Sequence, residues 1–263
     1  MYRYLFILPC LLCIFAISNA QSVNNRSKIK KEKKTEFYIS FGSHRAFYSK
    51  SDISFIGDGH NPFNFTLEKS RARDDQGVVW SNKAPQYSYS IGFYNKLKNY
   101  GIEFQFHHVK YIFRDNQVVH MNGTIGDKHY DQDTLVTPDF VEFEHCDGAN
   151  YALLNFVKRK NLASSQNQKS MLDLVLKAGA GVVIPKTEST IMGSYYHDKY
   201  AMSGYMASIA GGLRYSFLKN FFAEATAMGA YANYTHFLIA DGHGHQHWFS
   251  AQFNLLLGAQ FQL

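Results

Sequence analysis

The residues best suited to chemistry in this chain are three alternating histidines near its C-terminus. His243, His245 and His247 stand in the run DGHGHQH, and alternate residues of an extended segment point the same way. Neutral imidazoles bind zinc, copper and nickel. A metal centre usually also needs further fixed ligands and supporting hydrogen bonds, and the sequence identifies none. We therefore expect a solvated outer loop at these positions and assign no metal ligand.

Ser250 is a candidate nucleophile, because a serine is activated by a base within hydrogen-bond reach. His247 precedes it by an odd number of positions, so in a regular strand the two side chains point to opposite faces. Glu142, His145 and Asp147 could supply an acid and a base, but ordinary loop polarity explains them equally well. We assign no catalytic residue and no cofactor.

The element that carries the histidines and Ser250 is the C-terminal segment, 249–263. Its odd positions are Phe, Ala, Phe, Leu, Leu, Ala, Phe and Leu, whereas the even positions are mostly Ser, Gln, Asn and Gly. This period of two predicts a long strand with one apolar face and one largely polar face.

The same alternation recurs upstream and predicts eight strands in all. They are expected at 37–44, 87–94, 101–109, 149–158, 171–184, 202–216, 221–234 and 249–263. Short connections alternate with long ones, which is typical of an antiparallel up-and-down transmembrane β-barrel with short periplasmic turns and long extracellular loops.

The long connections themselves contain segments of β character. These are 51–56, 63–67, 117–125 and 140–143, and they are expected to extend the strands above the membrane as a crown of hairpins. A barrel of ten strands is the alternative count.

The predicted register turns several charged side chains toward the interior of the barrel. The interior of an eight-stranded barrel is just wide enough for side chains to fill, and buried charges are costly unless they are paired. We expect these residues to form a closed, mutually paired plug: Glu103, Asp173, Lys177, Arg214 and Glu224, with His44 and His107 nearby.

The N-terminus predicts export. Residues 1–20 have a basic start, an apolar run and a small-residue end, so we expect a signal peptide cleaved after Ala20. Segment 21–35 contains a cluster of lysines and is expected to be a flexible solvated tail, without nucleic acid as a partner. Cys10 and Cys13 lie in the signal peptide, so Cys146 alone remains and the exported chain has no internal disulfide.

The last six residues, Gly258 to Leu263, resemble the C-terminal assembly signal of outer-membrane barrels. The chain from residue 36 to 263 resembles a small outer-membrane β-barrel of the type that includes the OmpA transmembrane domain and OmpX. The final residue is Leu where that signal usually has Phe. The resemblance implies insertion by the barrel-assembly machinery and contact with outer-membrane lipid, and it transfers no activity.

The favoured function is a structural or surface-interaction role in a Gram-negative cell envelope, exerted through the external loops on an extracellular or envelope partner. A membrane enzyme that modifies lipid A is one alternative. A secreted soluble β-barrel that binds an apolar ligand is another. The sequence favours a role without catalysis.

Overall fold

The structure is a computed structural model that describes residues 35–263 apart from 60, 76–85, 146, 167–169 and 198. The predicted signal peptide with its cleavage site, the lysine cluster and Cys146 lie outside the described residues. In the part that is described, no helix is long and apolar enough to cross a membrane.

Eight antiparallel strands form a closed ring. Each strand pairs with the following one around the ring, and β17 pairs back with β1. In ring order the strands are β1 (Thr35–Tyr48), β5 (Ser88–Asn95), β6 (Tyr100–His107), β11 (Tyr151–Ser164), β12 (Met171–Val183), β15 (Gly204–Phe217), β16 (Phe221–Ile239) and β17 (Gly242–Gln262). All eight predicted strands are therefore present. Within the described residues, the additional strands do not enter this ring.

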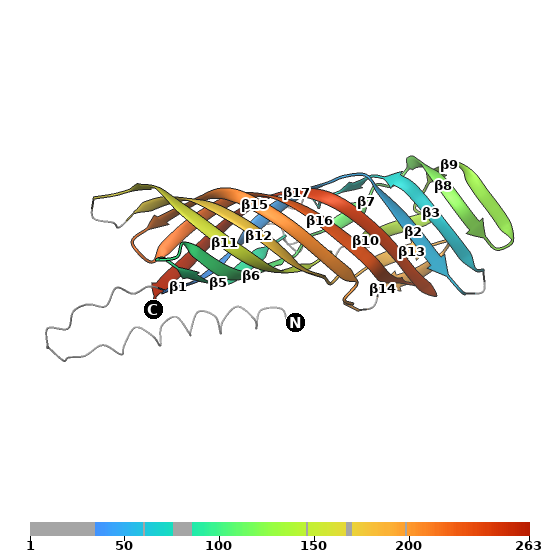
Figure 1. The fold of residues 1–263 in the computed structure, drawn as a ribbon. Coiled ribbons are helices and arrows are strands. Elements are labelled where there is room, and N and C mark those ends of the chain that lie inside the picture. Colours follow the sequence, from blue (N-terminus) through green and yellow to red (C-terminus); the bar gives the residue numbers. More distant parts are fainter. Residues whose placement is uncertain (1–34, 60, 76–85, 146, 167–169, 198) are drawn as a thin grey trace, which may run out of the picture. The chain divides into compact units, whose positions relative to one another are not determined.

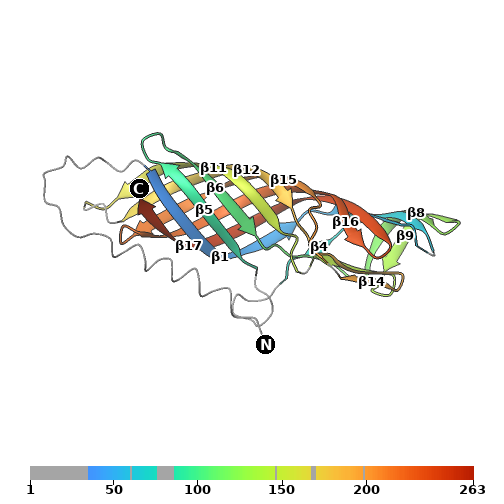
Figure 2. The ribbon, with the colours of Figure 1, turned by 90° about the horizontal axis from the view of Figure 1, so that it is seen from below.

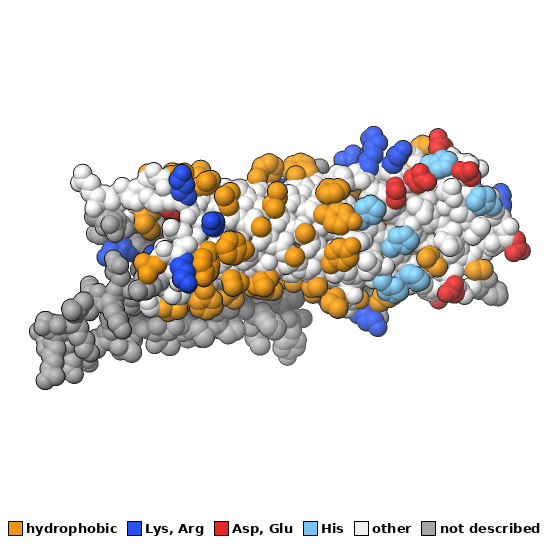
Figure 3. All heavy atoms as spheres, in the orientation of Figure 1, with side chains coloured by type: hydrophobic (Ala, Val, Ile, Leu, Met, Phe, Trp, Pro, Cys, Tyr) orange, Lys and Arg blue, Asp and Glu red, His pale blue; other side chains and the backbone are white. Residues whose placement is uncertain are grey.

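The surface of the ring is apolar and its interior is polar. Large apolar side chains project outward and are exposed, and Figure 3 shows them gathered over the barrel strands. A closed ring satisfies every strand edge, and an apolar outer band suits hydrocarbon, so the fold is a transmembrane β-barrel. Exposed members of the band include Phe41, Phe93, Phe104, Leu154, Phe156, Leu176, Ile209, Phe253, Leu255 and Leu257.

The first and last described strands, β1 and β17, close the barrel, and their outer ends meet at one rim. The Leu263 amide donates to the Thr35 carbonyl oxygen at 2.8 Å. Gly258 lies opposite Phe222 in the β16–β17 register, and a Cβ atom there would come within 2.2 Å of the Phe222 ring. The glycine of the predicted assembly signal is thus required because an inward-facing ring occupies that space.

The connections differ in length at the two rims. Residues 96–99 join β5 to β6 and residues 218–220 join β15 to β16, at the rim where Thr35 and Leu263 meet. The connection expected between the predicted strands 221–234 and 249–263 is not a long loop. β16 and β17 instead run on through a register shift between Tyr234 and Phe237 to a tight turn at 240–241 (Figure 1).

The extended hairpin of β16 and β17 begins the crown, a layer of two sheets beyond the barrel ring. The first sheet adds β2 (Ser51–Gly57), β3 (Phe63–Ser70), β8 (Gln117–Ile125) and β9 (Lys128–Val136) to β17. The second sheet has the order β14 (Ser194–His197), β13 (Glu188–Ile191), β10 (Val141–His145), β7 (Tyr111–Phe113) and β4 (Ala72–Arg73). All four β segments predicted in the long connections belong to these sheets, and Figure 2 shows β8 and β9 beyond the barrel strands.

Candidate functional site

A network of buried charges lies inside the barrel, toward the rim at which Thr35 and Leu263 meet. Lys177 Nζ lies 2.8 Å from a Glu103 oxygen and 2.7 Å from a Glu224 oxygen. The other Glu224 oxygen lies 2.6 Å from Arg214 Nη2. All of these side chains are almost completely buried. Four of the five charges predicted to face inward therefore meet in one cluster.

Two further members of the network were missed by the sequence analysis. Arg159 Nη1 lies 2.6 Å from Glu36 Oε1, and Arg214 Nη1 lies 3.9 Å from the same oxygen. The signs therefore alternate from Arg159 through Glu36, Arg214, Glu224 and Lys177 to Glu103. Three buried cations thus alternate with three buried anions, and the partly exposed Lys96 adds a fourth cation 3.3 Å from Glu36 Oε2.

Aromatic rings separate the cations of this network. The Arg214 guanidinium lies 3.8 Å from the centroid of the Phe222 ring and 4.5 Å from that of Tyr38. Arg159 lies over the same Tyr38 ring at 4.7 Å. The Tyr38 hydroxyl donates to Glu103 Oε2 at 3.0 Å, so the ring fills the space between two cations and also satisfies a carboxylate.

Asp173 does not belong to the network, contrary to the prediction. It lies opposite Arg214 in the β12–β15 register, yet Arg214 is paired with Glu224 and Glu36. Asp173 is half-buried and accepts a hydrogen bond from Asn161 Nδ2 at 2.9 Å. The reason is its position close to the end of β12, where water reaches the carboxylate.

His44 and His107 occupy the barrel interior, as predicted, but they do not contact the acidic side chains. Both are buried, and both Nδ1 atoms share the Ser88 hydroxyl at 2.9 and 2.8 Å. Their rings meet edge to face with centroids 5.4 Å apart. They extend the polar filling toward the crown.

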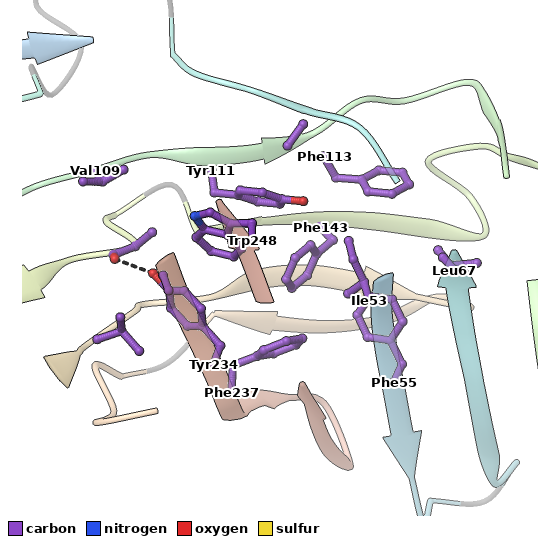
Figure 4. Close-up of a cluster of buried hydrophobic side chains, with 14 of the residues drawn as sticks. Ile53, Phe55, Leu67, Val109, Tyr111, Phe113, Phe143, Tyr234, Phe237 and Trp248 are labelled. Carbon is purple, nitrogen blue, oxygen red and sulfur yellow. Dashed lines mark hydrogen bonds between the residues drawn. The ribbon is translucent and has the colours of Figure 1, made fainter. Parts of the chain in front are cut away.

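Where the barrel meets the crown, the polar interior is replaced by a core of aromatic side chains. Trp248 of β17 stacks between Tyr111 and Tyr234, with ring centroids 4.4 and 4.5 Å away. Phe143 of the second sheet packs on Phe237 of β16 at 5.0 Å (Figure 4). The same cluster continues down to Met206 and Met228 on the barrel strands. The crown is thus a sandwich whose core lies over the barrel interior.

The Tyr234 hydroxyl and the Trp248 indole of this core have hydrogen-bond partners. The Tyr234 hydroxyl donates to the Ala149 carbonyl oxygen at 2.6 Å, as drawn in Figure 4. Trp248 Nε1 donates to the Tyr151 hydroxyl at 3.1 Å. Buried polar groups are costly unless they are hydrogen-bonded, so these bonds allow large amphipathic rings to serve as filling.

Glu142, His145 and Asp147 do not form an acid–base site. His145 is fully buried against Tyr234 and Phe143, whereas Glu142 is exposed on the opposite face of β10. Hydrogen bonds from Lys186 and His197, at 2.8 and 3.0 Å, lower the pKa of Asp147. His145 is core and Asp147 is part of a surface ion cluster.

The three alternating histidines lie on a strand and not on the expected loop. His245 and His247 are exposed on the outer face of β17, and His243 is half-buried. His236 of β16 stacks on His243, with ring centroids 4.5 Å apart. Within the described ranges, no group of three or more His, Cys, Asp or Glu side chains is arranged to hold a metal ion.

Ser250 is buried and faces the interior, whereas His247 faces outward. The strand keeps its period of two through both positions, as the odd spacing predicted. The serine therefore has no access to that imidazole, and this pair cannot form a nucleophile and its base.

The closed ring and its apolar band define a small transmembrane β-barrel of the outer-membrane type, the class predicted from the sequence. No protein-family model matches the chain, and no curated protein matches it.

Several solved barrels are similar at low sequence identity. The outer membrane protein OprG from Pseudomonas aeruginosa has a TM-score of 0.37 and 9% identity, over 90% of this chain and 100% of that one. The attachment invasion locus protein Ail of Yersinia pestis has a TM-score of 0.35 and 13% identity, over 87% of this chain and 99% of that one. The N-terminal β-barrel domain of P. aeruginosa OprF has a TM-score of 0.34 and 14% identity, over 87% of this chain and 98% of that one. The fold assignment rests on the strand pairing described above.

Neutralising one anion of the network should destabilise the barrel strongly. Glu224→Gln leaves Lys177 and Arg214 buried with one carboxylate fewer, which we expect to cost about 3–5 kcal/mol. The matched control, Asp173→Asn, should cost less than about 1 kcal/mol, because that carboxylate has access to water. Urea unfolding in lipid vesicles measures both. Equal losses of unfolding free energy in the two variants would contradict the placement of Glu224 inside the network and of Asp173 outside it.

The crown should lose stability in acid. Burial lowers the pKa of His145 from 6.5 to about 3. Below pH 6.5 the imidazole is therefore protonated in the unfolded state while it stays neutral in the folded state. Stability is retained above pH 6.5 and falls progressively toward pH 3, by about 2.7 kcal/mol at pH 4.5. Hydrogen exchange of β7 and β10 amides measures the effect. His145→Phe should reduce this pH dependence, and an unchanged dependence would refute the assignment to His145.

Proposed function

We propose that the chain is an integral outer-membrane protein whose barrel is closed to solutes and whose crown is displayed outside the cell as a rigid interaction surface. The observation that carries this proposal is the continuous filling of the molecule. Paired charges occupy one half of the barrel, and the aromatic core of the crown lies over the other. A barrel filled in this way offers no water path for solutes.

The crown favours a surface role because it is folded and not merely a set of long loops. Its two sheets bury Phe55 against Phe143 at 5.4 Å and Phe65 against Phe140 at 5.6 Å. Such a sandwich holds its outer side chains in fixed positions, which lowers the entropy lost when a partner binds. The partner we propose is an extracellular or envelope molecule.

Insertion by the barrel-assembly machinery follows from the C-terminal strand in this proposal. β17 ends on the run Gly258 to Leu263 and pairs with β1 to close the ring. The two alternative functions receive less support. The separation of His247 from Ser250 disfavours a lipid-modifying enzyme built on that pair, and the exposed apolar band disfavours a soluble carrier.

Cysteine labelling tests the location and the orientation together. In a Cys146→Ser background, Asn122→Cys places a thiol on the exposed face of β8 in the crown, and Lys98→Cys places one in the short turn between β5 and β6. A membrane-impermeant maleimide added to intact cells should modify the first and not the second. Lysis should expose both. Labelling of the Lys98→Cys variant on intact cells, or recovery of the protein in a soluble fraction, would contradict the proposal.

A further inference from the structure

The outer face of the crown carries a groove of about 660 Å³ at the base of β3 and β8. Cationic side chains dominate its charged lining, and Figure 3 shows Lys and Arg gathered between the apolar band and the rest of the crown. The lining residues are Lys50, Glu68, Lys69, Arg71, Gln117, Val118, Val119 and His120.

The backbone that presents two of these cations is held in place by side chains. Lys69 has a φ of 50°, an unusual conformation for a residue with a side chain. Its amide donates to Asp52 Oδ1 at 2.7 Å. The Arg71 amide donates to Gln117 Oε1 at 2.8 Å, and Gln117 Nε2 donates back to the Arg71 carbonyl oxygen at 3.0 Å. Strained backbone held in this way is often found at binding sites.

The lysine and arginine side chains of the groove form no ion pairs within the described residues. Within the described residues, the lysines and arginines that form ion pairs are Lys96, Lys110, Arg159, Lys177, Lys186 and Arg214. Lys50, Lys69 and Arg71 are exposed and belong to no such pair. These three cations share the lining with one carboxylate, Glu68. The nearby carboxylates are already bonded, Asp52 to the Lys69 amide and Asp131 and Asp133 to His120. The cations that remain unpaired favour an anionic ligand.

The position of the groove favours an anion that is attached to lipid. The Ser49 amide donates to the Phe249 carbonyl oxygen at 2.8 Å, so Lys50 follows directly above the apolar band. Val118 and Leu135 pair across β8 and β9 beside the cations, and they are 65% and 55% exposed. Exposed apolar side chains next to cations fit an amphiphile better than a free ion.

We propose that this groove binds the phosphate groups of an outer-leaflet glycolipid. Lys50, Lys69 and Arg71 contact the phosphates, and Val118 packs against the sugar or the acyl chains. The site would fix the height of the crown above the bilayer, and the inference rests on the outer-membrane location proposed above.

Native mass spectrometry of the full chain refolded in zwitterionic detergent tests the site, with bisphosphorylated lipid A as the probe. Wild-type protein should retain this lipid in preference to dephosphorylated lipid A. The double variant Lys69→Gln/Arg71→Gln should retain at least about tenfold less bisphosphorylated lipid A than the wild type. Lys69→Gln alone should weaken retention, whereas Lys128→Gln should not, because Lys128 lies at the hairpin tip, roughly 23 Å farther along the sheet.

Three outcomes would overturn the inference. Wild-type protein could retain both lipids equally, or the double variant could retain bisphosphorylated lipid A as the wild type does. Displacement of the lipid by an equal concentration of pyrophosphate would show that the ligand is a soluble anion. The comparison of the two lipids uses unaltered protein, so it stands even where a variant misfolds. Cysteine labelling on cells reports the membrane location independently of this groove.

Discussion

The alternating ion network inside the barrel is the interaction on which the rest of the structure depends. Its members come from six of the eight ring strands, β11, β1, β15, β16, β12 and β6. Charges removed from water are stable only when each has a partner of opposite sign at close range. A shift of one strand by one residue would turn its charge toward lipid and leave a partner unpaired. The network therefore specifies the register of most of the ring.

The two halves of the molecule are filled by opposite chemistry, and β17 passes through both. In the barrel its inner face carries Gln252 and Asn254 and its outer face carries Phe253 and Leu255. Beyond Phe249 the outer face changes to histidine and the inner face to Trp248. The strand keeps its period of two, but its outer face changes from apolar to polar, whereas the inner face still carries the buried Gln246 beside Trp248. The change on the outer face marks the edge of the apolar band.

The ring could be predicted from the sequence because every strand must alternate between lipid and a polar interior. The interior site was predicted less completely, and its errors lie at strand ends. Arg159 was assigned to a turn and Glu36 preceded the first predicted strand, yet β11 extends to Ser164 and β1 begins at Thr35. Polar residues on both faces of a strand end give no alternation, so the pattern cannot show where pairing stops. Asp173 was misplaced for the same reason.

The crown was anticipated only as separate β segments. Its core depends on contacts between distant positions, such as Tyr111 with Trp248 and Phe143 with Phe237, and no local pattern encodes these. His145 illustrates the limit, since a histidine between acidic residues resembles a loop site until the partner sheet is known to cover it. The same sheet pairing converts the expected histidine loop at 243–247 into a strand.

The central claim is that paired charges and the aromatic core close this barrel. Conductance across a planar lipid bilayer tests it most directly, with the full barrel inserted and its folding verified by heat-modifiable migration. A closed barrel should give no sustained channel openings above the bilayer baseline. Stable, ion-conducting openings of the wild-type protein would contradict the claim.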